Sequence, residues 1–158
     1  MRLTEQIAKH VRDLHFGGSF TGSSFRENLA GVTWQQATTP VHSLNTIATL
    51  VFHANYYVSA VVRVLEGGPL DAHDKYSFDC PPIQSQEDWD MLLEKTWADA
   101  ERFAELVEQL PDTALQEDFA EGKYGNSFRN FFGLSEHTHY HLGQIALIKR
   151  ILQDPEAQ

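Results

Sequence analysis

Cysteine is nearly absent from this sequence: Cys80 is the only one among 158 residues. A single cysteine permits no internal disulfide and no zinc site built from several thiolates. We therefore expect a reducing compartment, the cytoplasm. Cys80 stands directly before Pro81 and Pro82, and we interpret it as a passive small residue, because a nucleophilic thiol needs a basic environment that this stretch lacks.

Positive charge is also scarce. Twelve Lys and Arg residues face 22 Asp and Glu residues, for a formal net charge of −10. Nucleic acids and anionic membranes attract basic surfaces, so we predict neither as a partner. Uninterrupted apolar runs do not approach the ~20 residues needed to cross a bilayer. The N-terminal segment 1–18 is amphipathic and charged, without the apolar stretch of a secretory signal.

Several segments of the sequence repeat their apolar residues at helical spacing. Four long amphipathic segments are predicted at about 2–15, 41–65, 86–109 and 128–153. Strand-like alternation is missing between them, so the sequence predicts an all-α fold, a four-helix bundle forming one domain over residues 1–158. The intervening segments 66–84 and 111–126 are rich in Gly, Pro and polar residues and are predicted to be loops.

A long structured connection is expected between the first two helices. Ser24 with Glu27, and Thr33 with Gln36, have the spacing of capping boxes for two short helices. We expect three aromatic residues to anchor the connection: Phe20, Phe25 and Trp34. Two roles remain open at this point, namely packing against the body and forming a lid over a pocket.

The segment 41–65 is apolar on nearly every side. Such a helix is buried on most faces, either inside the bundle or against a second subunit. Because its apolar faces outnumber those that one bundle requires, we predict a homodimer.

Two histidines interrupt the apolar stripe of the last helix. His137 and His141 are four residues apart, so their imidazoles are neighbours on one face. Leu134, Ile145 and Ile148 share that face. A strand over His137–His141 would instead align three histidines, His139 included, but the run that follows lacks period-two alternation and favours a helix. On the helix, His139 points away from the pair.

His53 lies in the middle of the segment 41–65. A lone buried histidine is commonly satisfied by a carbonyl or hydroxyl group, but a histidine pair in the same small core favours a shared cation. His53, His137 and His141 are therefore predicted to be the ligands of a divalent transition metal, with one coordination position left open. Imidazole suits several metals, and we expect zinc or nickel first. Thr138 follows His137, so the H-E-x-x-H motif of zinc proteases and its general base are absent.

Two stretches, LVFHANYY around His53 and HTHYHLGQI from His137 to Ile145, resemble the DinB-like family of metal-binding four-helix bundles. The resemblance runs through most of the chain. It implies that His53, His137 and His141 bind the metal, with Gly143 and Gln144 completing an H-x-x-x-H-x-G-Q pattern. Leu142 stands where the family often has arginine. Because the family includes thiol-dependent transferases and isomerases, the resemblance implies a low-molecular-weight thiol as a second cofactor.

The function we expect is thiol-dependent S-transferase-like chemistry on a small-molecule substrate at this metal site. Three alternatives remain open: a metal-dependent hydrolase, a non-catalytic metal-binding or stress-response module, and a bundle without metal. No general acid or base is identifiable from the residues.

The sequence also predicts roles for residues near the three histidines. Candidate acceptors for the second ring N–H of the ligands are Asn45, Asn55, Glu136 and backbone carbonyls. Gly143 is predicted to mark a close backbone approach, and Gln144 to serve structure rather than catalysis. The residues predicted to form pocket walls are Tyr56, Tyr57 and Tyr140.

Overall fold

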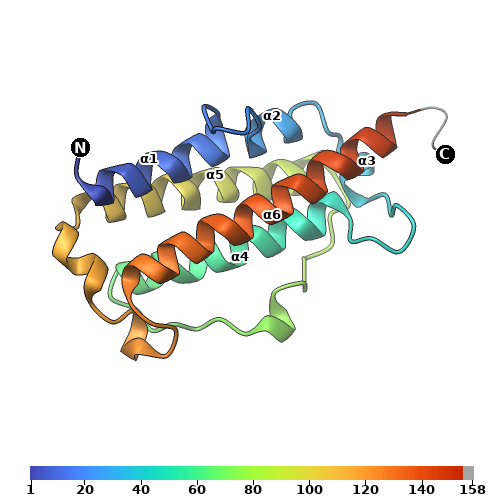
Figure 1. The fold of residues 1–158 in the computed structure, drawn as a ribbon. Coiled ribbons are helices and arrows are strands. Elements are labelled where there is room, and N and C mark those ends of the chain that lie inside the picture. The colour runs from blue at the N-terminus through green and yellow to red at the C-terminus, as the bar shows by residue number, and fades with distance from the viewer. Residues whose placement is uncertain (155–158) are drawn as a thin grey trace.

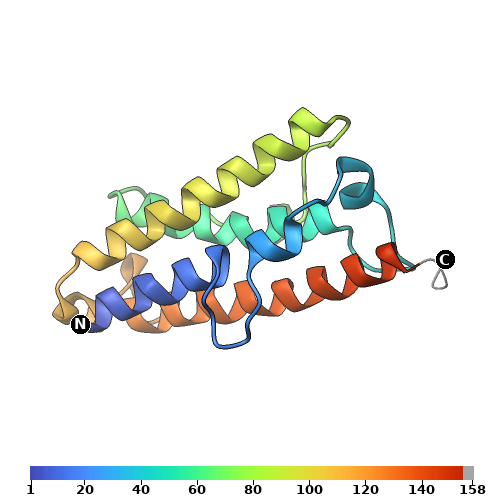
Figure 2. The same ribbon diagram turned by 90° about the horizontal axis from the view of Figure 1, so that it is seen from above.

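The computed structural model describes residues 1–154 and is all-helical over that range, with a single isolated bridge between Asp118 and Asn126 (Figure 1). Its four long helices are α1 (Leu3–Phe16), α4 (Ile47–Leu65), α5 (Gln86–Gln109) and α6 (Ser127–Gln153). They lie side by side in both views (Figures 1 and 2). α1 and α4 each contact both α5 and α6, so the four helices enclose a common interior.

Shorter helical turns fill the connections. α2 (Phe25–Leu29) and α3 (Trp34–Thr38) lie between α1 and α4. The 3-10 turn η1 (Asp74–Tyr76) lies between α4 and α5, and η2 (Asp112–Gln116) and η3 (Ala120–Gly122) lie between α5 and α6. The segments predicted as loops thus contain short turns but no further α-helix within the described residues.

The predicted bounds of the long helices hold to within a residue or two, with one exception. α4 begins at Ile47 rather than at Val41. Thr46 is extended and its hydroxyl accepts a hydrogen bond from the backbone N–H of Thr49, which caps the helix there. His42 has a φ of 49°, which a right-handed helix cannot contain. The predicted start was therefore wrong.

The long connection packs as predicted at all but one of its anchors. Phe25, Leu29 and Ala37 are buried, and Trp34 is partly buried against the same cluster. The Ser24 and Thr33 caps both form. Phe20 is fully exposed, so its predicted anchoring role was wrong.

Buried apolar residues form two clusters along the helices. One cluster includes Ile47 to Ala54 of α4 and Leu142 to Ile148 of α6. The other includes Val58 to Val62 of α4 and Phe131 and Leu134 of α6. The histidines of α4 and α6 lie where one cluster gives way to the other, which places them in the middle of the interior.

α4 is long and apolar enough to cross a membrane by length and composition alone, contrary to the expectation that no segment approached this. However, 61% of the tested window is buried inside the protein, and the core helix of a soluble protein passes the same test. Every residue of α4 except Arg63 is at least partly buried by this one chain. The apolar faces that we assigned to a second subunit are therefore covered largely within the chain.

Candidate metal centre

Three imidazoles from two helices converge on one point. The Nε2 atom of His137 lies 3.0 Å from Nε2 of His53 and 3.1 Å from Nε2 of His141. All three ligand atoms lie within 4.8 Å of one another. Around a tetrahedral zinc with Zn–N bonds of 2.0–2.1 Å, neighbouring nitrogens would be about 3.3 Å apart. The three histidines that the sequence singles out could therefore hold one metal ion.

The contacts of the Nδ1 atoms of His53 and His141 show which ring nitrogen carries the hydrogen in each neutral imidazole. The backbone oxygen of Ser77 lies 3.2 Å from Nδ1 of His53, and Oε1 of Gln144 lies 2.7 Å from Nδ1 of His141. Both oxygens accept hydrogen bonds, so both Nδ1 atoms carry the hydrogen of the neutral ring. His53 and His141 consequently present Nε2 lone pairs to the centre.

His137 cannot satisfy both of these lone pairs. If its hydrogen is on Nε2, it donates to only one of the two neighbours. If its hydrogen is on Nδ1, three lone pairs face one another. In either case its Nδ1 atom is buried without a hydrogen-bond partner among residues 1–154. A cation would accept all three lone pairs at once, so the donor set fits a divalent metal.

The environment keeps all three imidazoles neutral, as metal ligands must be. Burial, together with the neighbouring imidazoles of His141 and His53, lowers the pKa of His137 to about 4. Burial is also the main cause that lowers the pKa of His53 and of His141. The nitrogens therefore carry free lone pairs at neutral pH.

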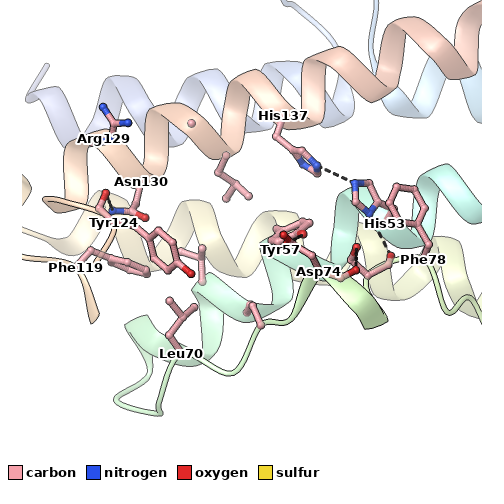
Figure 3. Close-up of a pocket in the computed structure, with 16 residues that line it drawn as sticks. His53, Tyr57, Leu70, Asp74, Phe78, Phe119, Tyr124, Arg129, Asn130 and His137 are labelled. Atoms are coloured by element: carbon pink, nitrogen blue, oxygen red, sulfur yellow. Dashed lines mark hydrogen bonds between the residues drawn. The ribbon is translucent and has the colours of Figure 1, made fainter. Parts of the chain in front are cut away.

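A segment between α4 and α5 covers the centre. The ring of Phe78 stacks on that of His53, with centroids 3.8 Å apart and planes at 11°. Ser77 is buried, and its hydroxyl donates to the backbone oxygen of Asp74, which tightens this turn. Phe78 and Ser77 therefore orient His53 from the side opposite to α6 (Figure 3).

A carboxylate and a phenol lie beside the histidines. The hydroxyl of Tyr57 donates to Oδ1 of Asp74 over 2.6 Å. The ring of Tyr57 meets those of His137 and His53 edge-on, with centroids 4.9 and 5.5 Å apart. Burial and the hydrogen bond to Asp74 raise the pKa of Tyr57. This hydrogen-bonded pair could exchange a proton with a bound molecule, and no such group was identifiable from the sequence.

A cavity of about 680 Å³ opens onto the centre at His53 and His137. It continues between α4 and α6 to Phe119, Tyr124 and Arg129 (Figure 3). Its walls between these ends are mainly apolar. No residue of the connection 17–46 lines it, so the lid role considered for that connection has no basis here. The segment carrying Asp74 and Phe78 borders the cavity instead.

Several expectations about the neighbours were wrong. Asn55 donates to Asp99, and its side-chain oxygen accepts no hydrogen bond from a ligand histidine or from any other group among residues 1–154. The expectation of a backbone carbonyl is confirmed for His53, whose Nδ1 contacts the backbone oxygen of Ser77. Gln144 is the acceptor for His141, so neither Asn45 nor Glu136 has this role. A Cβ atom added at Gly143 would meet nothing within 4 Å, so this glycine marks no close approach.

Other neighbours divide between the site and the surface. Tyr57 does line the cavity, whereas Tyr56 donates to the backbone oxygen of His73 and Tyr140 is 66% exposed. His139 points away from the pair, as predicted, and its Nε2 lies 3.4 Å from the hydroxyl of Thr21. Burial raises the pKa of Cys80 to about 11, which agrees with a passive thiol.

The chain matches no family model, no curated protein and no solved structure. The class that fold and site define is thus an all-helical protein with a three-histidine cluster able to hold a metal ion.

Proposed function

We propose that this chain is a DinB-like four-helix bundle and a metal-dependent enzyme that transfers the sulfur of a low-molecular-weight thiol to a small electrophile. The observation that carries the proposal is the convergence of three imidazole Nε2 atoms beside a cavity large enough for a small molecule. His53, His137 and His141 would hold the metal, with zinc or nickel expected first. Three protein ligands leave a position to which a thiol sulfur can bind.

When bound, a metal of this kind lowers the pKa of a coordinated thiol, so that a thiolate forms near neutral pH. The residues beside it manage the proton. Asp74 accepts the proton released by the thiol through the hydroxyl of Tyr57, since these two groups are already hydrogen-bonded.

The reaction consumes only the thiol and the electrophile. The thiolate sulfur attacks an electrophilic carbon, the new S–C bond forms, and the leaving group departs with the electron pair of the bond that breaks. The proton on Asp74 then passes to solvent. Phe78, beside the histidines, contacts the electrophile and helps to exclude water from the nucleophile.

The test is turnover of an activated aryl chloride with a panel of thiols by zinc- and nickel-loaded protein. We expect activity that is lost in His137→Ala and retained in the matched control His139→Ala, which changes a histidine on the same helix outside the centre. Equal activity in the unmodified protein and in His137→Ala would overturn the proposal. One equivalent of bound metal with no turnover on any thiol would instead support the non-catalytic metal-binding module.

A further inference from the structure

The cavity has two chemically different ends. If the proposed thiol transfer takes place here, these two ends indicate what kind of thiol is the substrate. His53, His137 and the Asp74 carboxylate lie at one end. Arg129 and Tyr124 lie at the other end (Figure 3). Arg129 is the only arginine or lysine among the lining residues of the described chain.

Several arginines of this acidic protein already have acidic partners. Arg12 pairs with Glu101 and Glu108, and Arg102 pairs with Glu66 and Glu105. Within residues 1–154, the guanidinium group of Arg129 has neither an acidic partner nor a backbone oxygen as acceptor. Its planar set of donors matches the two oxygens of a carboxylate.

The turn before α6 holds this arginine in place. Gly125 has a φ of 87°, and a Cβ atom added to it would lie only 3.0 Å from Cδ of Arg129. The side-chain amide of Asn130 donates to the backbone oxygens of Tyr124, Gly125 and Asn126, which fixes the same turn. The stem of Arg129 thus lies against a fixed backbone, and because the residue is exposed its guanidinium group is accessible to a ligand.

The distance between the two ends sets a length. Arg129 and His137 are eight residues apart on one helix, which is about 12 Å along its axis. An extended chain covers about 3.5 Å for every three bonds, so ~12 Å corresponds to about ten bonds. The wall between the ends is apolar and includes Val61, Leu70, Phe119 and Leu134.

We propose that the thiol substrate is an elongated molecule with a terminal carboxylate about ten bonds from its sulfur. The carboxylate binds Arg129, the middle of the molecule lies along the apolar wall, and the sulfur reaches the histidine centre. The opposite orientation would place the thiol beside Arg129 and would leave the guanidinium group without a charged partner.

The test measures binding rather than turnover. Protein loaded with cobalt(II) is titrated with ω-mercapto carboxylic acids of three, eight and eleven carbons, and with the ω-mercapto alcohols of the same lengths. Sulfur binding is followed by the thiolate-to-cobalt charge-transfer absorption. We expect the eleven-carbon acid to bind at least about tenfold more tightly than its alcohol, as for a hydrogen bond to a charged group, and the three-carbon pair to bind equally.

Arg129→Gln is expected to remove the preference for the acid and to leave the affinity for the alcohol unchanged. Arg150→Gln is the matched control, since it removes the same charge from an exposed position of the same helix that does not line the cavity. Equal binding of acid and alcohol by the unmodified protein would overturn this inference alone. An equal loss of preference in Arg150→Gln would overturn it as well, because the effect would then be one of net charge. Absence of the charge-transfer absorption with every thiol would overturn the proposed thiol chemistry itself.

Discussion

Replacing His137 with leucine distinguishes a metal ligand from a histidine that merely packs in the core. The ring of His137 is partly buried, and its Nδ1 atom is inaccessible to solvent and has no hydrogen-bond partner among the described residues. Leucine is apolar and of similar size, so it removes the imidazole nitrogens and leaves no large void. The variant therefore isolates the contribution of the nitrogens.

The expected change in the metal-free protein is small. An unsatisfied buried polar atom costs about 1–3 kcal/mol, which leucine recovers. The substitution also removes the one hydrogen bond that a neutral His137 donates to His53 or His141, worth about 0.5–1.5 kcal/mol. The free energy of unfolding should therefore change by no more than about 2.5 kcal/mol, with stabilisation the more favoured sign.

Zinc should separate the two proteins clearly. At a free zinc concentration 100 times the dissociation constant, binding to the native state adds about 2.7 kcal/mol of stability. For a chain of this length, that corresponds to a rise in Tm of roughly 5–11 °C. His137→Leu retains two of the three ligands and should show almost none of this rise.

The assay is thermal unfolding by circular dichroism with chelator or with buffered zinc, for the unmodified protein, His137→Leu and His139→Leu. His139→Leu serves as the control and should keep the full response to zinc. The ligand assignment fails if His137→Leu destabilises the metal-free protein by more than about 3 kcal/mol, the cost expected for loss of a well-satisfied core group. It also fails if zinc raises the Tm of all three proteins equally.

Three further outcomes are expected. Gln144→Leu removes the acceptor that orients His141 and should weaken zinc binding 10–100-fold in a chelator competition, whereas Gln144→Glu should not; equal affinities would contradict the role of Gln144. Burial lowers the pKa of His15 to about 4, below the unfolded value of 6.5, so its contribution to stability is complete above pH 6.5 and is lost as the pH falls through 4. That loss amounts to about 3 kcal/mol, and urea unfolding at pH 7 and pH 4 should show His15→Leu losing less stability than the unmodified protein. Sedimentation should give twice the chain mass of 17.9 kDa if the predicted homodimer forms, and the single mass would refute it.

The long helices could be predicted from sequence because their signals are local. Apolar spacing and the Gly- and Pro-rich connections placed the body of each helix, and the structure shows Ser85 capping α5. The same local signals brought His137 and His141 together, since a helix fixes the relation of residues four apart. That His53 meets them depended on a further inference, namely that one small core would hold all three histidines.

The remainder of the site depends on tertiary contacts that have no periodic signal. Asp74, Ser77 and Phe78 lie in an irregular segment whose path is decided by what it packs against. Two aromatic residues in an otherwise polar loop, Tyr76 and Phe78, were the available hint that part of it is held against the body. Gln144 was within reach of prediction, because three residues separate it from His141 and such neighbours meet on a helix.

The position of the histidines connects their chemistry to the stability of the fold. On α4 and α6, one apolar cluster stops at Ala54 and Leu142, and the other begins at Val58 and Leu134. At the level between them, the two helices meet through three imidazoles whose Nε2 lone pairs are not all satisfied when no cation is present. A metal bound there would join α4 to α6 through His53 and His137, which are 84 residues apart in the chain. Metal binding and the packing of α4 against α6 should therefore be thermodynamically linked. Ala54→Gly loosens this packing without changing a ligand, so we expect it to lower the affinity for zinc as well as the Tm.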